Sequence, residues 1–235
     1  MSALFNLGHI AKLHEIQKAH LKAGLPGIGR EVEELISRLE NGGVGKSAGD
    51  PRIAQAKKLW DLGFGRELKM NSFHAYFATI PEIPKSLVAD NPVLPLLVLV
   101  DPRLGHTRSC RLDGLRFAEY GWDDTSLVPF DDRHVMPSAP YWVRAHDGSP
   151  NLGKKPSDCR AKCTGKLYAG TADVGIAIWI QHGKCNHVMD LPGSVHISNR
   201  ESCACLGVWR GGLELGASRH DVTNTLFGSV VFVRE

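Results

Sequence analysis

The spacing of apolar residues divides the chain into a helical first part and a mixed second part. In residues 1–68, apolar side chains recur every three to four positions, which is the pattern of an amphipathic helix with one buried face. Glycine-rich segments separate three such stretches, so we expect an N-terminal three-helix segment with helices over residues 6–24, 32–42 and 50–63. In the third helix, Asp50-Pro51 supplies an N-cap and a first-turn proline, and we expect Leu59 and Trp60 in the core.

From residue 69 onward the pattern favours strands with helices between them. Apolar or aromatic runs predict strands over residues 73–80, 93–100, 141–145, 203–209, 213–218 and 229–234. Residues 106–119 are typical of a hairpin around Asp113-Gly114. Residues 156–182 return to a helical pattern, which Pro156 can start and Thr171 can cap. Strands joined by such short segments pair antiparallel. The expected fold is therefore α+β: the three-helix segment packs on or beside a mainly antiparallel sheet with one or two further helices, in an α+β domain of residues 69–235.

Charge and composition indicate a soluble protein. The chain has 28 Lys and Arg against 25 Asp and Glu, a net charge of +3, which is too small to favour nucleic acid or a membrane surface as a partner. The longest apolar run, residues 93–100, is interrupted by Pro95, whereas a membrane-spanning helix needs about 20 residues. The N-terminus lacks a signal-peptide pattern. We expect a cytoplasmic protein with no membrane partner and no nucleic-acid partner.

The six cysteines are either free thiols or part of a metal site. Cys159 and Cys163 are four residues apart and share a face if they are helical, and Cys203 and Cys205 share one face of a strand. Together they could supply four thiolates to a tetrahedral zinc. The spacings differ from those of common zinc sites, and cysteine often packs as a small buried apolar residue, so we expect independent thiols and no cofactor. A reactive thiol, at Cys185, is the third alternative.

Three polar clusters follow predicted strands, where a rigid sheet often positions binding residues. They supply six candidates for binding a ligand or acting as a base: Asp101, Arg103, Arg144, Asp147, Asp190 and Ser194. The competing interpretation is turn chemistry, because Asp-Pro and Asp-Gly are common turn dipeptides. The chain has no Gly-x-Ser-x-Gly, His-Glu-x-x-His or dinucleotide fingerprint, so the sequence leaves any catalytic residues unknown.

The motifs in the second part resemble, in their order and spacing, those of an uncharacterised bacterial family, a domain of unknown function. The likeness covers roughly residues 70–235 and rests on five motifs: Asp101-Pro102-Arg103-Leu104, Tyr141-Trp142-Val143-Arg144-Ala145-His146-Asp147-Gly148, Asp158-Cys159-Arg160, Met189-Asp190-Leu191-Pro192-Gly193-Ser194 and Gly228-Ser229. It implies a soluble bacterial protein and implies no activity. It draws attention to the segments 144–148 and 190–194.

The sequence favours a non-catalytic binding or interaction protein, whose partner would be a protein or a small-molecule ligand. The alternative is a hydrolase-like enzyme with a carboxylate- or metal-centred pocket. In an enzyme, the candidate side chains at the strand ends should converge in one cleft. In a binding module, they should be dispersed in turns.

Overall fold

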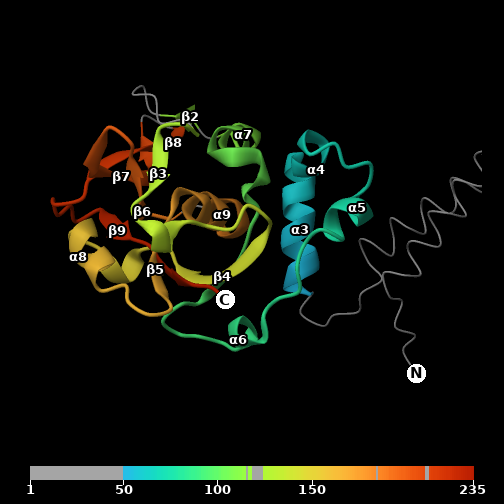
Figure 1. Cartoon of the computed structure of the whole chain (residues 1–235), viewed down its shortest axis with the longest axis horizontal. Coiled ribbons are helices and arrows are strands. Elements are labelled where there is room, and N and C mark those ends of the chain that lie inside the picture. The colour runs from blue at the N-terminus through green and yellow to red at the C-terminus, as the bar shows by residue number, and fades with distance from the viewer. Residues whose placement is uncertain (1–49, 115, 118–123, 184, 210–211) are drawn as a thin grey trace, which may run out of the picture. The chain divides into compact units, whose positions relative to one another are not determined.

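Two β-sheets and a central helix form the frame of the described part of the chain (Figure 1). The computed structural model describes residues 50–114, 116–117, 124–183, 185–209 and 212–235. Its contacts group Ala54–Glu235 in one unit and Met1–Ile53 in another. The expected helices over residues 6–24 and 32–42 lie outside the described residues. None of the described helices is long and apolar enough to cross a membrane.

Both sheets are mainly antiparallel, which confirms the predicted α+β class. The first sheet has four strands, all paired antiparallel, in the order β1 (Leu96–Val100), β4 (Tyr141–His146), β10 (Val231–Val233) and β5 (Leu167–Ala169). The second has the order β2 (Arg116–Phe117), β8 (Gly212–Arg219), β7 (Asn199–Trp209), β6 (Val188–His196) and β3 (Leu127–Pro129), with β9 (Phe227–Ser229) also beside β6. Only the β2–β8 and β6–β9 pairs are parallel among the described strands.

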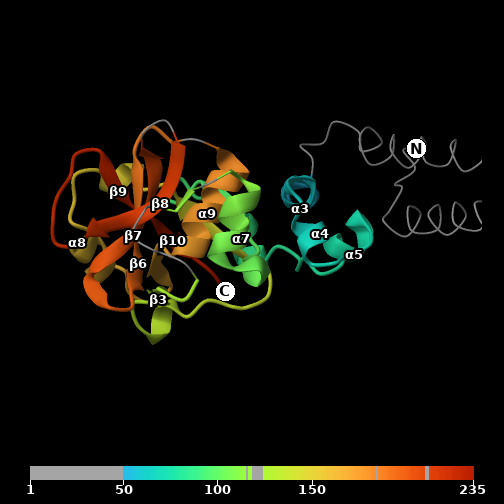
Figure 2. The same cartoon turned by 90° about the horizontal axis from the view of Figure 1, so that it is seen from above.

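Helix α9 (Ala172–His182) contacts β1 of the first sheet and β6 and β7 of the second, and it lies beside α7 (Gly105–Leu112) (Figure 2). Its residues from Ala172 to Ile180 are buried with the exception of Asp173, as expected for a helix that is apolar on all sides. Gly175 allows its close approach to β6, because a Cβ there would lie 2.6 Å from the side chain of Leu191.

Helix α3 (Pro51–Leu62) is the third predicted helix, and α4 (Phe64–Glu67) follows it. Gln55 joins α3 to the edge strand β1: its Nε2 donates to the carbonyl oxygen of Leu97 (2.7 Å), and its Oε1 accepts from the amide of Leu99 (2.7 Å). Leu59 is buried as predicted. Trp60 is only half-buried, so that prediction was wrong: its ring lies at the rim of an aromatic cluster, with its centroid 6.1 Å from that of Phe73. That the helical segment of residues 1–68 packs on or beside the sheet, with an α+β domain over residues 69–235, stays a prediction.

The predicted strand over residues 73–80 is wrong, because residues Phe73–Phe77 form helix α5. The hydroxyl of Ser72 accepts from the amide of Ala75 (3.1 Å) and caps the helix. The buried side chains Tyr76, Phe77 and Ile80 also follow a helical spacing, so the aromatic composition of this segment, and not its spacing, favoured a strand. The short helix α6 (Lys85–Val88) follows.

The predicted hairpin over residues 106–119 is also wrong. Residues Gly105–Leu112 form helix α7, which follows the 3-10 turn η1 (Pro102–Leu104). Asp113-Gly114 ends this helix: Gly114 has a φ of +70°, and its amide donates to the carbonyl oxygen of Arg111 (3.2 Å). A left-handed glycine serves equally as a helix stop and as a hairpin turn.

The other predicted elements are present with altered boundaries. Strand β1 begins after Pro95 and lies at a sheet edge, where a proline is tolerated. Residues 156–182 form α8 (Pro156–Ala161) and α9, with β5 between them. The run 229–234 divides at Val230, where the chain passes from β9 in one sheet to β10 in the other. Two further 3-10 turns are η2 (Asp132–His134) and η3 (Ser149–Asn151).

Candidate functional site

Asp101 and Arg103 form a buried network at the end of β1. The Asp101 carboxylate accepts from the Tyr76 hydroxyl (2.8 Å), from Nε of Arg103 (2.8 Å) and from Nη2 of Arg103 (2.6 Å). The Arg103 Nη1 donates to the Thr79 hydroxyl (2.9 Å). Burial and the Asp101 charge raise the pKa of Tyr76, so its phenol stays protonated. This network fixes α5 against β1.

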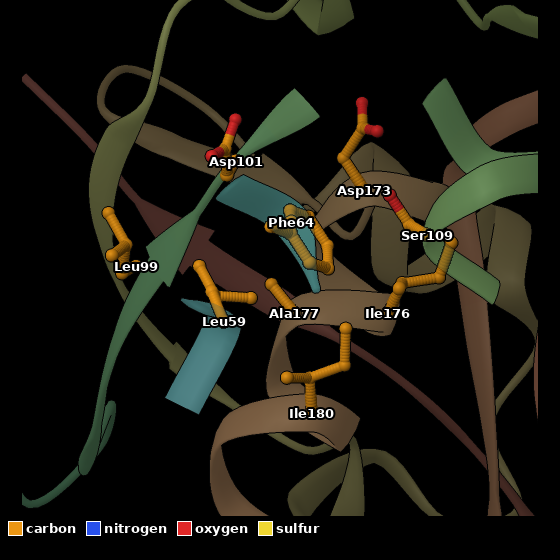
Figure 3. A pocket seen from close by; sticks show the side chains of 9 residues that line it. All are labelled: Leu59, Phe64, Leu99, Asp101, Ser109, Asp173, Ile176, Ala177 and Ile180. Atoms are coloured by element: carbon orange, nitrogen blue, oxygen red, sulfur yellow. The ribbon is translucent and has the colours of Figure 1, made fainter. Parts of the chain in front are cut away.

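A small cavity of about 10 Å³ lies below this network, between α3, β1, α7 and α9. The carboxylates of Asp101 and Asp173 lie toward one end of it, and Leu59, Ala177 and Ile180 lie toward the other (Figure 3). A space of this size holds at most about one water molecule, so Asp101 belongs to the core and not to a ligand pocket.

Arg144 and Asp147 also have structural partners. The Arg144 guanidinium is buried and donates to the carbonyl oxygens of Leu87 (2.8 Å), Pro95 (3.0 Å) and Val88 (3.2 Å). The Asp147 carboxylate accepts from the amide of Ser149 (2.9 Å) and so closes the turn after β4. The turn-chemistry interpretation describes Asp147 well, and Arg144 holds α6 to strand β4.

Asp190 and Ser194 lie within β6, whereas the sequence placed them in a loop after a strand. Pairing with β7 passes from Leu191–Ala204 to Val195–Cys203, so three residues of β6 bulge out of the ladder. The bulge is held by other partners: the Gly193 amide donates to the Gly170 carbonyl oxygen (2.8 Å). Bulges often redirect side chains toward a functional site. Here the bulge directs Ser194 to α9, while Asp190 contacts Ser218 of β8. The six predicted binding residues therefore do not converge in one cleft.

The four cysteines of the alternative zinc hypothesis are not grouped as a metal site. In the described ranges of the chain, no three His, Cys, Asp or Glu side chains are grouped so that they could hold a metal ion. The Cys163 thiol donates to the Cys159 carbonyl oxygen (3.3 Å), and Cys203 Sγ lies 3.4 Å from the Ser218 hydroxyl. These cysteines pack as separate buried thiols.

We expect the native thiols to react slowly with a thiolate-selective disulfide reagent. Burial raises the pKa of Cys110 and Cys203 to about 12 and that of Cys163 to about 11. Burial also raises the pKa of Cys185, whose thiol donates to the His187 carbonyl oxygen (3.2 Å), so its proposed reactivity is not supported. All six cysteines should react at once in guanidinium chloride. Fast labelling of any buried thiol in the native protein would contradict this prediction.

A larger cavity, which we call the histidine pocket, has a volume of about 310 Å³. Segments far apart in the sequence meet there: α7, β3, η2, the start of α9 and the bulge of β6. Its polar lining residues are His106, Asp124, His134, Thr171, Asp173 and Ser194. Of the six predicted binding residues, Ser194 alone is among them.

His134 lines this pocket and has one ring nitrogen without a hydrogen-bond partner. Its Nδ1 lies 2.6 Å from Oδ1 of Asp131, and its Nε2 is buried and has no hydrogen-bond partner. Burial alone would raise the pKa of Asp131, but hydrogen bonds and the charge interaction with His134 lower it, so this carboxylate stays ionised. Gly193 makes room for the ring, because a Cβ there would lie 2.7 Å from Cδ2 of His134.

The N-terminus of α9 forms one wall of the pocket. The amide of Ala172 donates to the Ser194 hydroxyl (2.9 Å), which therefore caps the helix. Thr171 occupies the N-cap position, but its buried hydroxyl has no hydrogen-bond partner. A second buried hydroxyl without a partner, that of Tyr141 on β4, is close enough for the Asp173 charge to affect its pKa. Orphaned buried polar groups are rare and often mark sites that a ligand completes.

His106 lies between two carboxylates on the same side of the pocket. Its Nε2 is 3.0 Å from Oδ1 of Asp173, and its Nδ1 is 3.6 Å from Oδ1 of Asp124. Burial lowers the pKa of His106, but the hydrogen bond and charge of Asp173, with the charge of Asp124, outweigh burial and raise it. His106 therefore holds a proton more readily than an ordinary histidine.

We expect the His106 ion pair to stabilise the fold more at low pH. Because its folded-state pKa is raised, its contribution is fully present below the unfolded value and is lost as pH rises through the folded value. Urea denaturation of His106→Gln should show a loss, relative to the unsubstituted protein, on the order of 1 kcal/mol at about pH 5.5 and less at about pH 9. His220→Gln, at a partly exposed position, is the control. A loss that grew with pH would contradict the expected sign.

The sequence contained weak signals for these residues. Asp131 and His134 have the spacing of a one-turn contact, and Pro192-Gly193 within an apolar segment is typical of a bulge. Neither signal shows that the segment of Asp131 and His134 meets the segment of Pro192 and Gly193, so the pocket could not be predicted from the sequence.

Comparison with known proteins gives no match to this chain among family models, curated proteins or solved structures. The resemblance to the uncharacterised bacterial family stays a prediction. The function must therefore be argued from the pocket itself.

Proposed function

We propose that the protein is a hydrolase-like enzyme that binds a small polar molecule in the histidine pocket and uses His134 as its general base. The observation that carries this proposal is that His134 lines the pocket and pairs through Nδ1 with Asp131, while its buried Nε2 has no hydrogen-bond partner. An Asp–His pair in this arrangement fixes the tautomer with a proton on Nδ1 and leaves Nε2 able to accept one. The Asp131 carboxylate then stabilises the imidazolium that forms.

The lining of the pocket indicates the kind of ligand. At about 310 Å³ the cavity is at the small end of ligand sites. Asp124 and Asp173 accept hydrogen bonds, the Thr171 hydroxyl can donate or accept one, and Leu127 and Met136 add apolar surface. An uncharged molecule with hydroxyl or amide groups fits this lining better than an anion, because two carboxylates face the cavity.

Proton transfer in such a site needs few groups. His134 Nε2 takes the proton of a water molecule or a ligand hydroxyl, and the oxygen so activated attacks a neighbouring electrophilic centre. The protonated His134 then returns the proton to the leaving group. His106, which holds its proton readily, can donate a hydrogen bond to negative charge that develops in the pocket.

Binding without catalysis, in the same pocket, is the second candidate. The engagement of the Ser194 hydroxyl as the cap of α9 favours it, because this hydroxyl accepts from the Ala172 amide and is not hydrogen-bonded to His134 as an activated nucleophile would be.

Diethyl pyrocarbonate, a small carbonyl electrophile, tests the reactivity of His134 in the intact protein. His134 and His146 are both buried, but we expect His134 to be modified faster. Asp131 holds the proton on Nδ1 of His134 and leaves Nε2 unprotonated, whereas Nδ1 of His146 accepts from the Gly148 amide (3.0 Å), so its Nε2 carries the proton. Asp131→Asn should slow the modification about tenfold or more, because the asparagine does not stabilise the cationic ring. Peptide mapping by mass spectrometry measures each site. Equal rates of His134 modification in the unsubstituted protein and in Asp131→Asn would overturn the role of the Asp131–His134 pair.

Hydrolysis of p-nitrophenyl acetate separates the two candidates. An enzyme should hydrolyse this ester about tenfold or more faster than its His134→Gln variant. His220→Gln, at a position outside the pocket lining, should keep the rate of the unsubstituted protein. A fast chemical modification of His134 combined with no hydrolysis beyond that of His134→Gln would exclude the catalytic proposal and leave binding.

A further inference from the structure

A second cavity, which we call the Asp190 pocket, lies outside the proposed site. Its volume is about 280 Å³. It is formed by β6, the end of β8 and the segment between β8 and β9, and its lining residues are Asp190, Ala217, Ser218, Arg219, Val222, Asn224 and Phe227. It contains one of the binding residues that the sequence predicted, and the proposed enzyme chemistry makes no use of it.

The carboxylate of Asp190 is the unusual group in this cavity. It is 1 % exposed, and its Oδ1 accepts from the Ser218 hydroxyl (2.5 Å). Burial raises its pKa to about 6, against the effect of the Ser218 hydrogen bond. Within the described ranges no basic side chain forms an ion pair with Asp190. A buried carboxylate that is ionised at neutral pH without a cationic partner is costly, so the position favours a ligand that supplies the positive charge.

The remaining walls of the pocket are apolar or already satisfied. Phe227 and Val222 supply apolar surface, and Val222 is 50 % exposed, so it lies at the mouth. The Arg219 guanidinium is paired with Asp221 through two hydrogen bonds (3.0 and 2.8 Å). This pairing offsets the positive charge of Arg219, so a positively charged ligand can enter the pocket beside it.

We propose that the Asp190 pocket binds a primary alkylamine in its ammonium form. The ammonium group would donate to the Asp190 carboxylate and the Ser218 hydroxyl, and the alkyl chain would lie against Val222 and Phe227. An ammonium carries three donors on a compact charge, which suits a pocket whose lining holds one buried carboxylate. The proposal is independent of the chemistry at His134.

Titration with n-butylammonium chloride, followed by NMR on the whole chain, tests this site. We expect saturable shifts at residues of the pocket and an affinity in the millimolar range, since a ligand of this size has few contacts. 1-Butanol and sodium butyrate, which match the chain but lack the positive charge, should produce no such saturation. Saturable binding of 1-butanol with equal affinity would overturn the role of the carboxylate, and the absence of saturation by n-butylammonium would overturn the site.

The variant Asp190→Asn keeps the shape of the side chain and removes its charge. It should weaken n-butylammonium binding about tenfold or more, while Asp158→Asn, an exposed position in α8, should leave binding unchanged. Because the substitution removes a costly buried charge, the variant is expected to fold, and circular dichroism checks this. Unaltered binding by folded Asp190→Asn would falsify the proposal.

The pH dependence provides a further readout of the same site. Binding should be weaker at about pH 5 than at about pH 7.5, because protonation of Asp190 removes the negative charge. The thiols beside Asp190 do not change charge in this interval, because burial raises the pKa values of Cys203 and Cys205, and Arg219 stays paired with Asp221. The variant His220→Gln, which removes the histidine next to Arg219, should show the same pH dependence. Affinity that stayed constant between these pH values would contradict an ionic contact with Asp190.

Discussion

Replacing Asp101 with alanine is expected to lower the free energy of unfolding by about 3–5 kcal/mol. The Asp101 side chain is fully buried, and that of Arg103 is only 18 % exposed. Removing the carboxylate leaves the guanidinium and the Tyr76 hydroxyl without their partner in a region that excludes water. Urea denaturation followed by tryptophan fluorescence measures the change.

Tyr76→Phe is the matched control for this network. It removes one donor and leaves the ion pair intact, so it should cost about 1.5–3 kcal/mol, the usual range for a hydrogen bond to a charged group. A loss below about 1 kcal/mol in Asp101→Ala would show that water or another group replaces the carboxylate, and that the network does not hold α5 to β1.

Gly148→Ala is expected to destabilise the fold by a similar amount, about 3–5 kcal/mol. Two causes combine at this position. Gly148 has a φ of +101°, and a Cβ there would lie 2.2 Å from the carbonyl oxygen of Gly228. The backbone after β4 thus passes directly over β9. A residue larger than glycine at position 148 or 228 would prevent this close approach. Thermal and urea denaturation should both detect the change.

Two further variants separate these causes. Gly228→Ala meets the same contact from the other side, with a Cβ at 2.3 Å from the Gly148 carbonyl oxygen, but at a φ that other residues adopt. Gly165→Ala has a φ of +59° and nothing within 4 Å of the added Cβ, so it should cost only about 1 kcal/mol. If Gly148→Ala cost no more than Gly165→Ala, the close passage of the two backbones would be refuted.

The motifs that stood out in the sequence have structural roles in the fold. Asp101 and Arg103 belong to the core network, and Gly148 and Gly228 form the close passage of two backbones. Gly193 and Ser194 form the bulge that admits the His134 ring and caps α9. Asp190 alone among the six predicted binding residues combines a buried charge with an open cavity.

The sequence by itself determined the elements whose signals are local. The Asp50-Pro51 start of α3, the apolar run of β1 and the ending of β4 at Asp147-Gly148 were predicted, because caps, periodicity and turn residues act within a few positions. The errors at α5 and α7 are also local. A short aromatic-rich segment and an Asp-Gly pair are each compatible with two structures, and packing against β1 and α9 selects the helix.

The tertiary structure alone decided the site. His106, His134, Thr171 and Ser194 come from four segments that meet in one pocket, and no local pattern records such a meeting. It depends on the irregular register between β6 and β7, which turns Ser194 toward α9, and on Gly193, whose missing side chain makes room for His134. The physical reason is that hydrophobic periodicity and helix capping depend on residues close together in the sequence. The contacts between distant segments are fixed instead by strand register and by how closely two backbones can approach.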